Sequence, residues 1–119
     1  MLPQLQRHWC KRGNFVKNIS IMASFSDLIK SSKPVLIDFY ATWCGPCKTM
    51  SPILEQLKSS MGDQIAILKI DVDKNQGVAA KYQVRGVPTL MIFKNGEQLW
   101  RESGVFAAAD LEGILKNFL

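Results

Sequence analysis

Two cysteines separated only by Gly-Pro lie between a predicted strand and a predicted helix, and this arrangement constrains the fold more than any other feature. Residues 35–40 have the sequence VLIDFY. This run is too short to span a membrane, and its β-branched and aromatic content favours a buried strand. After the cysteines, apolar residues recur with the period of one helix face: Met50, Ile53, Leu54, Leu57 and Met61.

The position of the cysteines favours thiolate chemistry. Backbone N–H groups at a helix N-terminus are unpaired, and the helix dipole favours negative charge, so a thiolate is stabilised there. Cys44 comes first and is the predicted nucleophile. Cys47, three residues later, shares its face of the helix and can close a small disulfide ring.

A lone C-x-x-C pair does not separate a redox site from a zinc site, because both kinds of site use it. His8 and Cys10 would complete a set of four zinc ligands with Cys44 and Cys47. A zinc knuckle does not need a long buried strand before its cysteines, which favours the redox interpretation. The residues alone leave both open.

Three motifs together resemble the thioredoxin family: ATWCGPCK at 41–48, RGVPT at 85–89 and FKNGE at 93–97. They occur in the order and spacing of the family, within a resemblance that runs from about Ser24 to Leu119. The resemblance implies the α/β thioredoxin fold, a central mixed β-sheet flanked by helices on both faces.

The other sequence patterns agree with such a sheet. Ser24–Asp27 is a capping box that predicts a helix from Ser24 to about Ser31, with Phe25, Leu28 and Ile29 facing inward. Asn95-Gly96 between two apolar runs predicts a hairpin with a type I′ turn. Further predicted elements are a strand at 64–71, a helix at 75–82, hairpin strands at 89–93 and 98–101, and a closing helix with Leu111, Ile114, Leu115 and Phe118 inward.

Asp38 lies in the middle of the predicted strand, where a carboxylate is costly unless it is paired or used. Burial should raise its pKa toward neutrality, which suits a general base. In the family the matching aspartate lies beneath the disulfide and assists proton transfer at the second cysteine, here Cys47. Lys69 matches the family's lysine on the neighbouring strand and is its expected partner. The alternative is a buried pair with a purely structural role.

The resemblance also implies a shallow apolar surface for substrates around Cys44. Pro88 matches the family's cis-proline, which holds Val87 ready to pair with an extended substrate backbone. The alternative for Pro88 is an ordinary proline that opens a strand. Gly104 matches a glycine that allows a partner backbone to approach closely. The expected surface comprises Trp43, Gly45, Pro46, Val87, Pro88, Gly104 and Val105.

Composition divides the chain into a basic arm, residues 1–21, and one domain, residues 22–119. The net charge is +5, yet 4 of the 15 basic residues precede Asp27, the first acidic one, which leaves 11 basic and 10 acidic residues from there on. The positive charge therefore gives no reason to expect a nucleic-acid partner. No apolar run reaches the length of a transmembrane helix. Part of the arm, around Phe15 to Met22, is a candidate edge strand.

Three cysteines are too few for a secreted disulfide framework and indicate a reducing compartment, which we expect to be the cytoplasm. The arm lacks the apolar region and cleavage site of a secretory signal, whereas a transit-like presequence stays open.

The resemblance implies a protein-disulfide reductase that is recharged by an NADPH-dependent thioredoxin reductase and acts on disulfide-containing protein substrates. We expect a monomer with no bound cofactor or metal, whose redox group is the Cys44–Cys47 disulfide. Two alternatives remain: a thiol oxidase or isomerase of the same fold, and a non-catalytic subunit that grips a partner. Gly-Pro between the cysteines favours the reductase over the oxidase.

Overall fold

A computed structural model describes residues 21–119 of the chain. Its elements in chain order are α2 (Ile21–Leu28), β1 (Val35–Tyr40), α3 (Gly45–Met61), a 3₁₀ turn (Gly62–Gln64), β2 (Ala66–Asp71), α4 (Gln76–Lys81), β3 (Thr89–Lys94), β4 (Glu97–Ser103) and α5 (Ala108–Lys116).

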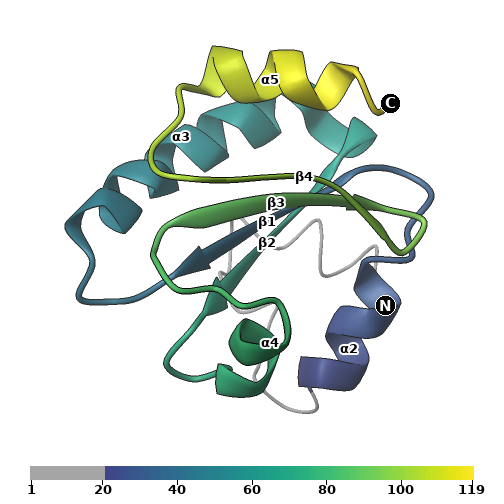
Figure 1. Cartoon of the computed structure of the whole chain (residues 1–119). Helices are drawn as coiled ribbons and strands as arrows, with labels where there is room; N and C mark the ends of the chain where they lie inside the picture. The colour runs from purple at the N-terminus through teal and green to yellow at the C-terminus, as the bar shows by residue number, and fades with distance from the viewer. Residues whose placement is uncertain (1–20) are drawn as a thin grey trace.

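Within these residues the four strands form one mixed sheet in the order β2-β1-β3-β4. β1 pairs with β2 in parallel and with β3 antiparallel, and β3 pairs with β4 antiparallel. Helices α3 and α5 cover one face of the sheet, and α2 and α4 lie on the other (Figure 1). The predicted fold class is confirmed.

β1 is the strand that carries the site, because it lies between two neighbours and is buried along its length up to the half-buried Tyr40. Parallel strands between helix layers are apolar on both faces, which explains the continuous VLIDF run. Asp38 interrupts this run with an exposure of 0%. Burying a carboxylate in this way costs free energy unless the group is paired or has a role in the chemistry.

β4 lies at one end of the order of strands and is largely exposed or half-buried. The turn before it has positive φ at both Asn95 (55°) and Gly96 (85°), as a type I′ turn requires.

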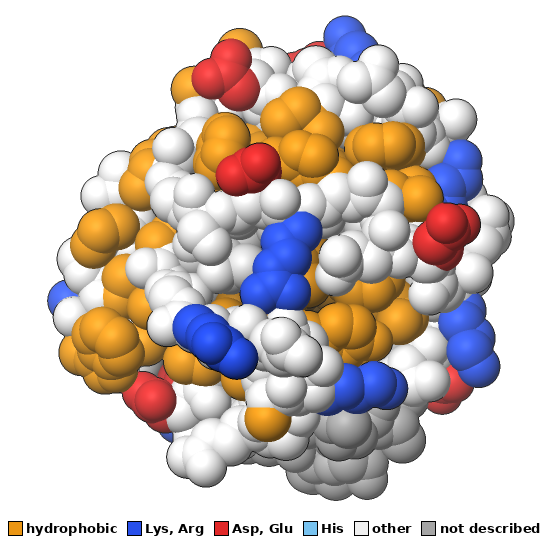
Figure 2. Space-filling view, viewed as in Figure 1, with side chains coloured by type: hydrophobic (Ala, Val, Ile, Leu, Met, Phe, Trp, Pro, Cys, Tyr) orange, Lys and Arg blue, Asp and Glu red, His pale blue; other side chains and the backbone are white. Residues whose placement is uncertain are grey.

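Figure 2 shows the face of the molecule that carries β4, where acidic and basic side chains are interspersed among apolar groups and no stripe of one charge forms.

Helix α3 begins directly after Cys44 and runs through Pro52 to Met61. The buried residues of this helix confirm most of the predicted apolar face, and they are Cys47, Met50, Leu54, Leu57 and Met61. Ile53, also predicted to face inward, packs against the core and is half-buried. No helix in the described residues is both long and apolar enough to cross a bilayer.

The start of α2 differs from the prediction. The helix begins at Ile21, so Ser24 lies inside it and does not cap it. Ile21, Met22 and Ala23 contain no helix breaker, and Met and Ala are strong helix formers, so the helix extends upstream of the polar pattern at Ser24. Phe25, Leu28 and Ile29 are buried, as predicted.

The predicted arm and its candidate edge strand lie almost entirely outside the described residues. Of the range 15–22, only Ile21 and Met22 are described, and both are helical.

Candidate functional site

Cys44 and Cys47 form a disulfide at the N-terminus of α3, with their Cα atoms 5.3 Å apart. Cys44 is the N-cap residue of the helix, and its Sγ accepts a hydrogen bond from the Cys47 backbone N–H at 3.1 Å. This N–H is one of the unpaired donors at a helix start, so it stabilises negative charge on Cys44 once the disulfide is reduced. Both side chains are largely buried, with exposures of 4% and 3%.

The loop of residues 86–88 lies against the disulfide. The Val87 carbonyl oxygen is 3.7 Å from Cys44 Sγ. The Val87–Pro88 peptide bond is cis, as the motif predicts. Pro88 is buried and its carbonyl accepts a hydrogen bond from the Gly104 N–H at 2.9 Å. Gly104 has φ 112°, a conformation that favours glycine. The loop and Gly104 are therefore held together beside the cysteines.

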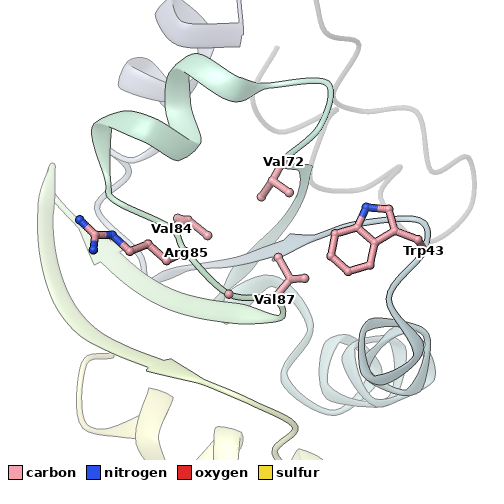
Figure 3. A pocket seen from close by; sticks show the side chains of 6 residues that line it. Trp43, Val72, Val84, Arg85 and Val87 are labelled. Atoms are coloured by element: carbon pink, nitrogen blue, oxygen red, sulfur yellow. The ribbon is translucent and has the colours of Figure 1, made fainter.

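Apolar side chains are exposed around this point. Trp43 is 69% exposed and Val105 45%, and Gly45 and Pro46 are exposed as well. A shallow pocket of about 110 Å³ is lined by Trp43, Val72, Val84, Arg85, Gly86 and Val87. In Figure 3 the Trp43 ring points toward Val72 and Val87, whereas the Arg85 guanidinium points away.

The orientation of Trp43 depends on a residue that the sequence did not single out. The indole Nε1–H donates to the Asp73 carboxylate at 2.8 Å. Asp73 follows β2, 30 residues from Trp43 along the chain. Its backbone N–H is in turn held by the Asp71 carboxylate at 2.8 Å. Nothing near Trp43 in the sequence indicates this contact.

Asp38 lies on β1 directly opposite Lys69 of β2 in the strand register. Neither of its carboxylate oxygens has a hydrogen-bond partner within the described part of the chain. Burial raises the pKa of Asp38 from 3.8 to about 7, and the positive charge of Lys69 opposes the rise. The direction is the one expected of a buried carboxylate.

The Lys69 side chain reaches α3. Its Nζ donates to Ser51 Oγ at 2.6 Å and lies 4.9 Å from the centre of the Tyr40 ring. A second pocket, of about 250 Å³, connects these groups to the disulfide and is lined by Tyr40, Ala41, Thr42, Cys47, Lys48, Ser51 and Lys69. Ser51 was not singled out from the sequence, although its spacing of four residues from Cys47 places both on one helix face.

Residues 21–119 contain no group of three or more histidine, cysteine or acidic side chains arranged to hold a metal ion. His8 and Cys10, the other members of the alternative zinc set, lie outside the described residues.

Comparison with known proteins gives consistent matches. Residues 16–117 match the model of the thioredoxin family. A thioredoxin-like protein of Synechocystis is 49% identical over 98 residues, which cover 82% of this chain and 93% of that protein. Chloroplastic thioredoxin Y of Oryza sativa subsp. japonica is 49% identical over 90 residues, 75% of this chain and 54% of that protein. The structure of a mutant thioredoxin from Halobacterium salinarum has a TM-score of 0.73 at 40% identity, covering 81% of this chain and 83% of that chain.

Proposed function

The chain belongs to the thioredoxin family and is a protein disulfide oxidoreductase that uses its own Cys44–Cys47 disulfide, and from this premise we propose the role of each residue in the reaction. The observation that carries the proposal is Cys44 at the N-cap of α3, with the Cys47 N–H directed at its sulfur. A thiolate at that place is the stabilised form and the reactive one.

In the proposed reaction the Cys44 thiolate attacks one sulfur of a substrate disulfide. A Cys44–substrate disulfide forms, and the other substrate sulfur leaves as a thiolate. Cys47 then loses its proton and attacks Cys44 Sγ, which forms the Cys44–Cys47 disulfide and releases the second substrate thiolate. Two electrons pass to the substrate, whose two thiolates take up protons.

Asp38 is the proposed acceptor of the Cys47 proton. A base works best when its pKa lies near the operating pH, and burial brings the pKa of Asp38 to about 7. Lys69 is the proposed counter-charge that keeps part of the Asp38 population ionised. Its charge opposes the effect of burial on that carboxyl.

The proposed substrate surface surrounds Cys44 and consists of Trp43, Gly45, Pro46, Val87, Pro88, Gly104 and Val105. Its exposed apolar side chains suit contact with an unfolded or extended segment. Val87 precedes β3 and is the residue that offers backbone groups to such a segment. Substrates are therefore disulfides in accessible, extended stretches of protein.

A coupled assay tests this function. The full chain, mixed with a thioredoxin reductase, NADPH and insulin, is expected to support continuous NADPH oxidation, whereas the Cys44→Ser, Cys47→Ser double variant supports none. No turnover of the parent protein with any reductase would contradict the reductase role. We further propose that the active species is a monomer, which sedimentation of the assayed protein checks.

Two other functions predict different results. A thioredoxin has a reduction potential of about −270 mV, and a thiol oxidase or isomerase would have a much less negative one. Equilibration of the protein with glutathione measures this potential. A non-catalytic subunit would keep its partner's activity when both cysteines are replaced by serine. The Gly-Pro pair between the cysteines supports the reductase.

The N-terminal segment is proposed to be dispensable for catalysis. A chain that begins at Met22 is expected to keep reductase activity. Some stability should be lost, because this truncation removes the first residue of α2, Ile21, and the start of the family match, which begins at residue 16. A second chain that begins at residue 16 is the matched control for that loss.

Metal content separates this proposal from the zinc interpretation. We expect no stoichiometric zinc in the full chain. Zinc in the full chain that is lost with His8 and Cys10 would contradict a purely redox role for the cysteines.

We propose that the protein works in the cytoplasm, on the ground of its few cysteines. The chloroplastic name of one relative makes an organelle the alternative. Fluorescent fusions of the full chain and of the chain from Met22 decide between them. An organellar signal from the full chain alone would assign the arm a targeting role.

A further inference from the structure

The Lys69 side chain is fixed by contacts that lie outside the established redox pair. Its Nζ donates a hydrogen bond of 2.6 Å to Ser51 Oγ and lies over the Tyr40 ring at 4.9 Å. These contacts bridge β2 to α3 and to β1. A long lysine side chain loses much rotamer freedom when it is ordered, so two anchors are a substantial constraint on where its charge lies.

Unlike Lys69, the Asp38 side chain is not held by any hydrogen bond within the described residues. It is fully buried, and neither carboxylate oxygen has a hydrogen-bond partner in the described part of the chain. Lys69 pairs with it in the β1–β2 register, so both side chains leave the sheet on the face covered by α3. The ionised carboxylate therefore depends on a charge at a distance, not on a direct hydrogen bond.

We propose that Ser51 is a positioning residue whose hydroxyl holds the Lys69 ammonium group above Tyr40, on the same face as Asp38, and thereby favours the ionised form of the Asp38 carboxylate. Ser51 lies outside the proposed substrate surface and acts through Lys69. The consequence for catalysis rests on the proposed function, in which ionised Asp38 takes the Cys47 proton.

Other groups that face this region are few. Tyr40 on β1 and Asp71 on β2 lie on the same face as Asp38. Burial is the main cause that raises the pKa of Tyr40, and the carboxylates of Asp71 and Asp38 raise it further. From α3, Cys47 and Lys48 line the same pocket as Lys69. On β3 the register partner of Asp38 is Leu90, which carries no charge. Lys69 is the cation that acts on the pKa of Asp38.

The test follows the Asp38 carboxyl itself in the oxidised protein, where Cys44 and Cys47 do not titrate. Carboxyl ¹³C chemical shifts are measured against pH for the parent, Ser51→Ala, Lys69→Met and the double variant. We expect Ser51→Ala to raise the Asp38 midpoint above about 7. The rise should reach up to about one pH unit, and Lys69→Met should raise it further, because a close opposite charge is worth about one to three units.

The double variant distinguishes positioning from a local structural effect. If Ser51 acts through Lys69, removing its hydroxyl adds nothing once the lysine is gone, so the double variant should titrate like Lys69→Met. Ser51→Thr keeps a hydroxyl and should restore a midpoint near that of the parent. An unchanged midpoint in Ser51→Ala, or additive shifts in the double variant, would overturn the proposal.

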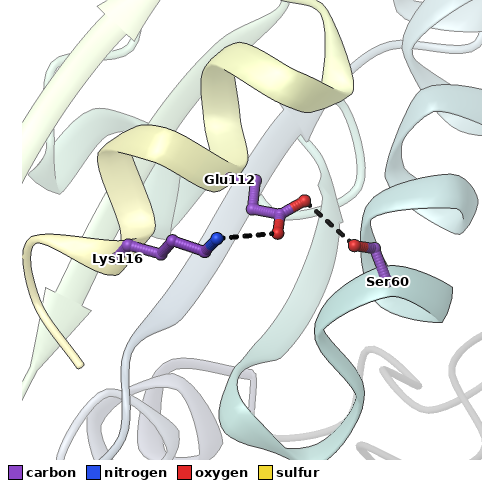
Figure 4. Close-up of polar contacts among 3 residues, drawn as sticks. All are labelled: Ser60, Glu112 and Lys116. Atoms are coloured by element: carbon purple, nitrogen blue, oxygen red, sulfur yellow. Dashed lines mark hydrogen bonds and ion pairs between the residues drawn. The ribbon is translucent and has the colours of Figure 1, made fainter.

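Ser60→Ala is the matched control. Ser60 is another α3 hydroxyl, which donates to Glu112 of α5 at 2.9 Å, and Glu112 in turn pairs with Lys116 at 3.3 Å (Figure 4). This variant removes a hydrogen bond from the same helix far from the pocket residues. It should leave the Asp38 midpoint where it is in the parent, and a shift equal to that of Ser51→Ala would also count against the proposal.

Kinetics then separate this proposal from the proposed role of Asp38. Release of substrate at pH 7 should slow by up to about fivefold in Ser51→Ala, because a one-unit rise lowers the ionised fraction from about one half to about one tenth. If the Asp38 midpoint moves but release stays unchanged in both Ser51→Ala and Asp38→Asn, the base role fails while the positioning by Ser51 stands. If Asp38→Asn slows release but the midpoint does not move in Ser51→Ala, the positioning fails alone.

Discussion

Replacing Cys47 by serine is expected to leave protein substrates covalently attached to Cys44. The first attack needs only the Cys44 thiolate, whose stabilising contacts, the α3 N-terminus and the backbone N–H of residue 47, survive the change. Without the second thiol the mixed disulfide has no internal route to release. Catalytic turnover should be abolished, and trapped adducts should be visible on non-reducing gels and disappear with reductant.

The matched variant is Cys44→Ser, which removes the predicted nucleophile and should trap almost nothing. Both variants belong in a Cys10→Ser background, so that the third cysteine cannot form adducts of its own. Equal trapping by the two variants would show that the roles of Cys44 and Cys47 are not distinct as proposed.

Replacing Asp38 by asparagine is expected to slow substrate release and to stabilise the fold, two opposite effects from one carboxyl. A positioned general base contributes roughly 10²–10⁴-fold, so release near pH 7 should slow by at least about tenfold. Single-turnover release of substrate from preformed mixed disulfide measures this step. Release as fast as in the parent would reduce Asp38 to a structural residue.

The stability effect has a defined pH dependence. Because burial raises the pKa of Asp38 from 3.8 to about 7, the folded state binds the proton more tightly than the unfolded chain does. The contribution of Asp38 protonation to the free energy of unfolding is fully present below about pH 4. It is lost as the pH rises through about 7, a change of up to about 4 kcal/mol.

Asparagine carries no charge, so the advantage of Asp38→Asn over the parent should grow from about pH 4 and be largest above about pH 7. Urea unfolding of the oxidised proteins measures it. Glu55→Gln, at an exposed position of α3, is the control and should change the free energy of unfolding by less than about 0.5 kcal/mol at every pH. A pH-independent difference for Asp38→Asn would contradict the assignment of the shift to Asp38.

The part of the site that sequence could predict is the part made by local chemistry. A buried strand that ends before Cys44 and an apolar helix face after Cys47 require the cysteines to lie at a helix start. A carboxylate in the middle of that strand, Asp38, had to be buried whatever the rest of the fold. The motif around Pro88 indicated the cis bond, which the structure contains.

The parts that sequence did not predict come from contacts between distant segments. Asp73 holds the Trp43 indole from a turn after β2, and Ser51 holds Lys69 across two elements. Each is a polar side chain of a common kind with no local pattern that distinguishes it. The start of α2 was misplaced for another reason: a capping pattern at Ser24 is compatible with the interior of a helix, and only the upstream residues decide where the helix begins.

The short spacing of the two cysteines also affects the cost of each catalytic cycle. A crosslink stabilises a protein mainly by reducing the freedom of its unfolded chain, and the effect grows with the length of the loop that it closes. Here the bridged residues are only 3 apart in sequence. The disulfide therefore restrains the unfolded ensemble far less than one that spans the domain, so we expect sheet and helix packing to supply most of the stability in both oxidation states. A protein that opens this bridge at every turnover can therefore change its oxidation state with little change in the conformational entropy of its unfolded chain.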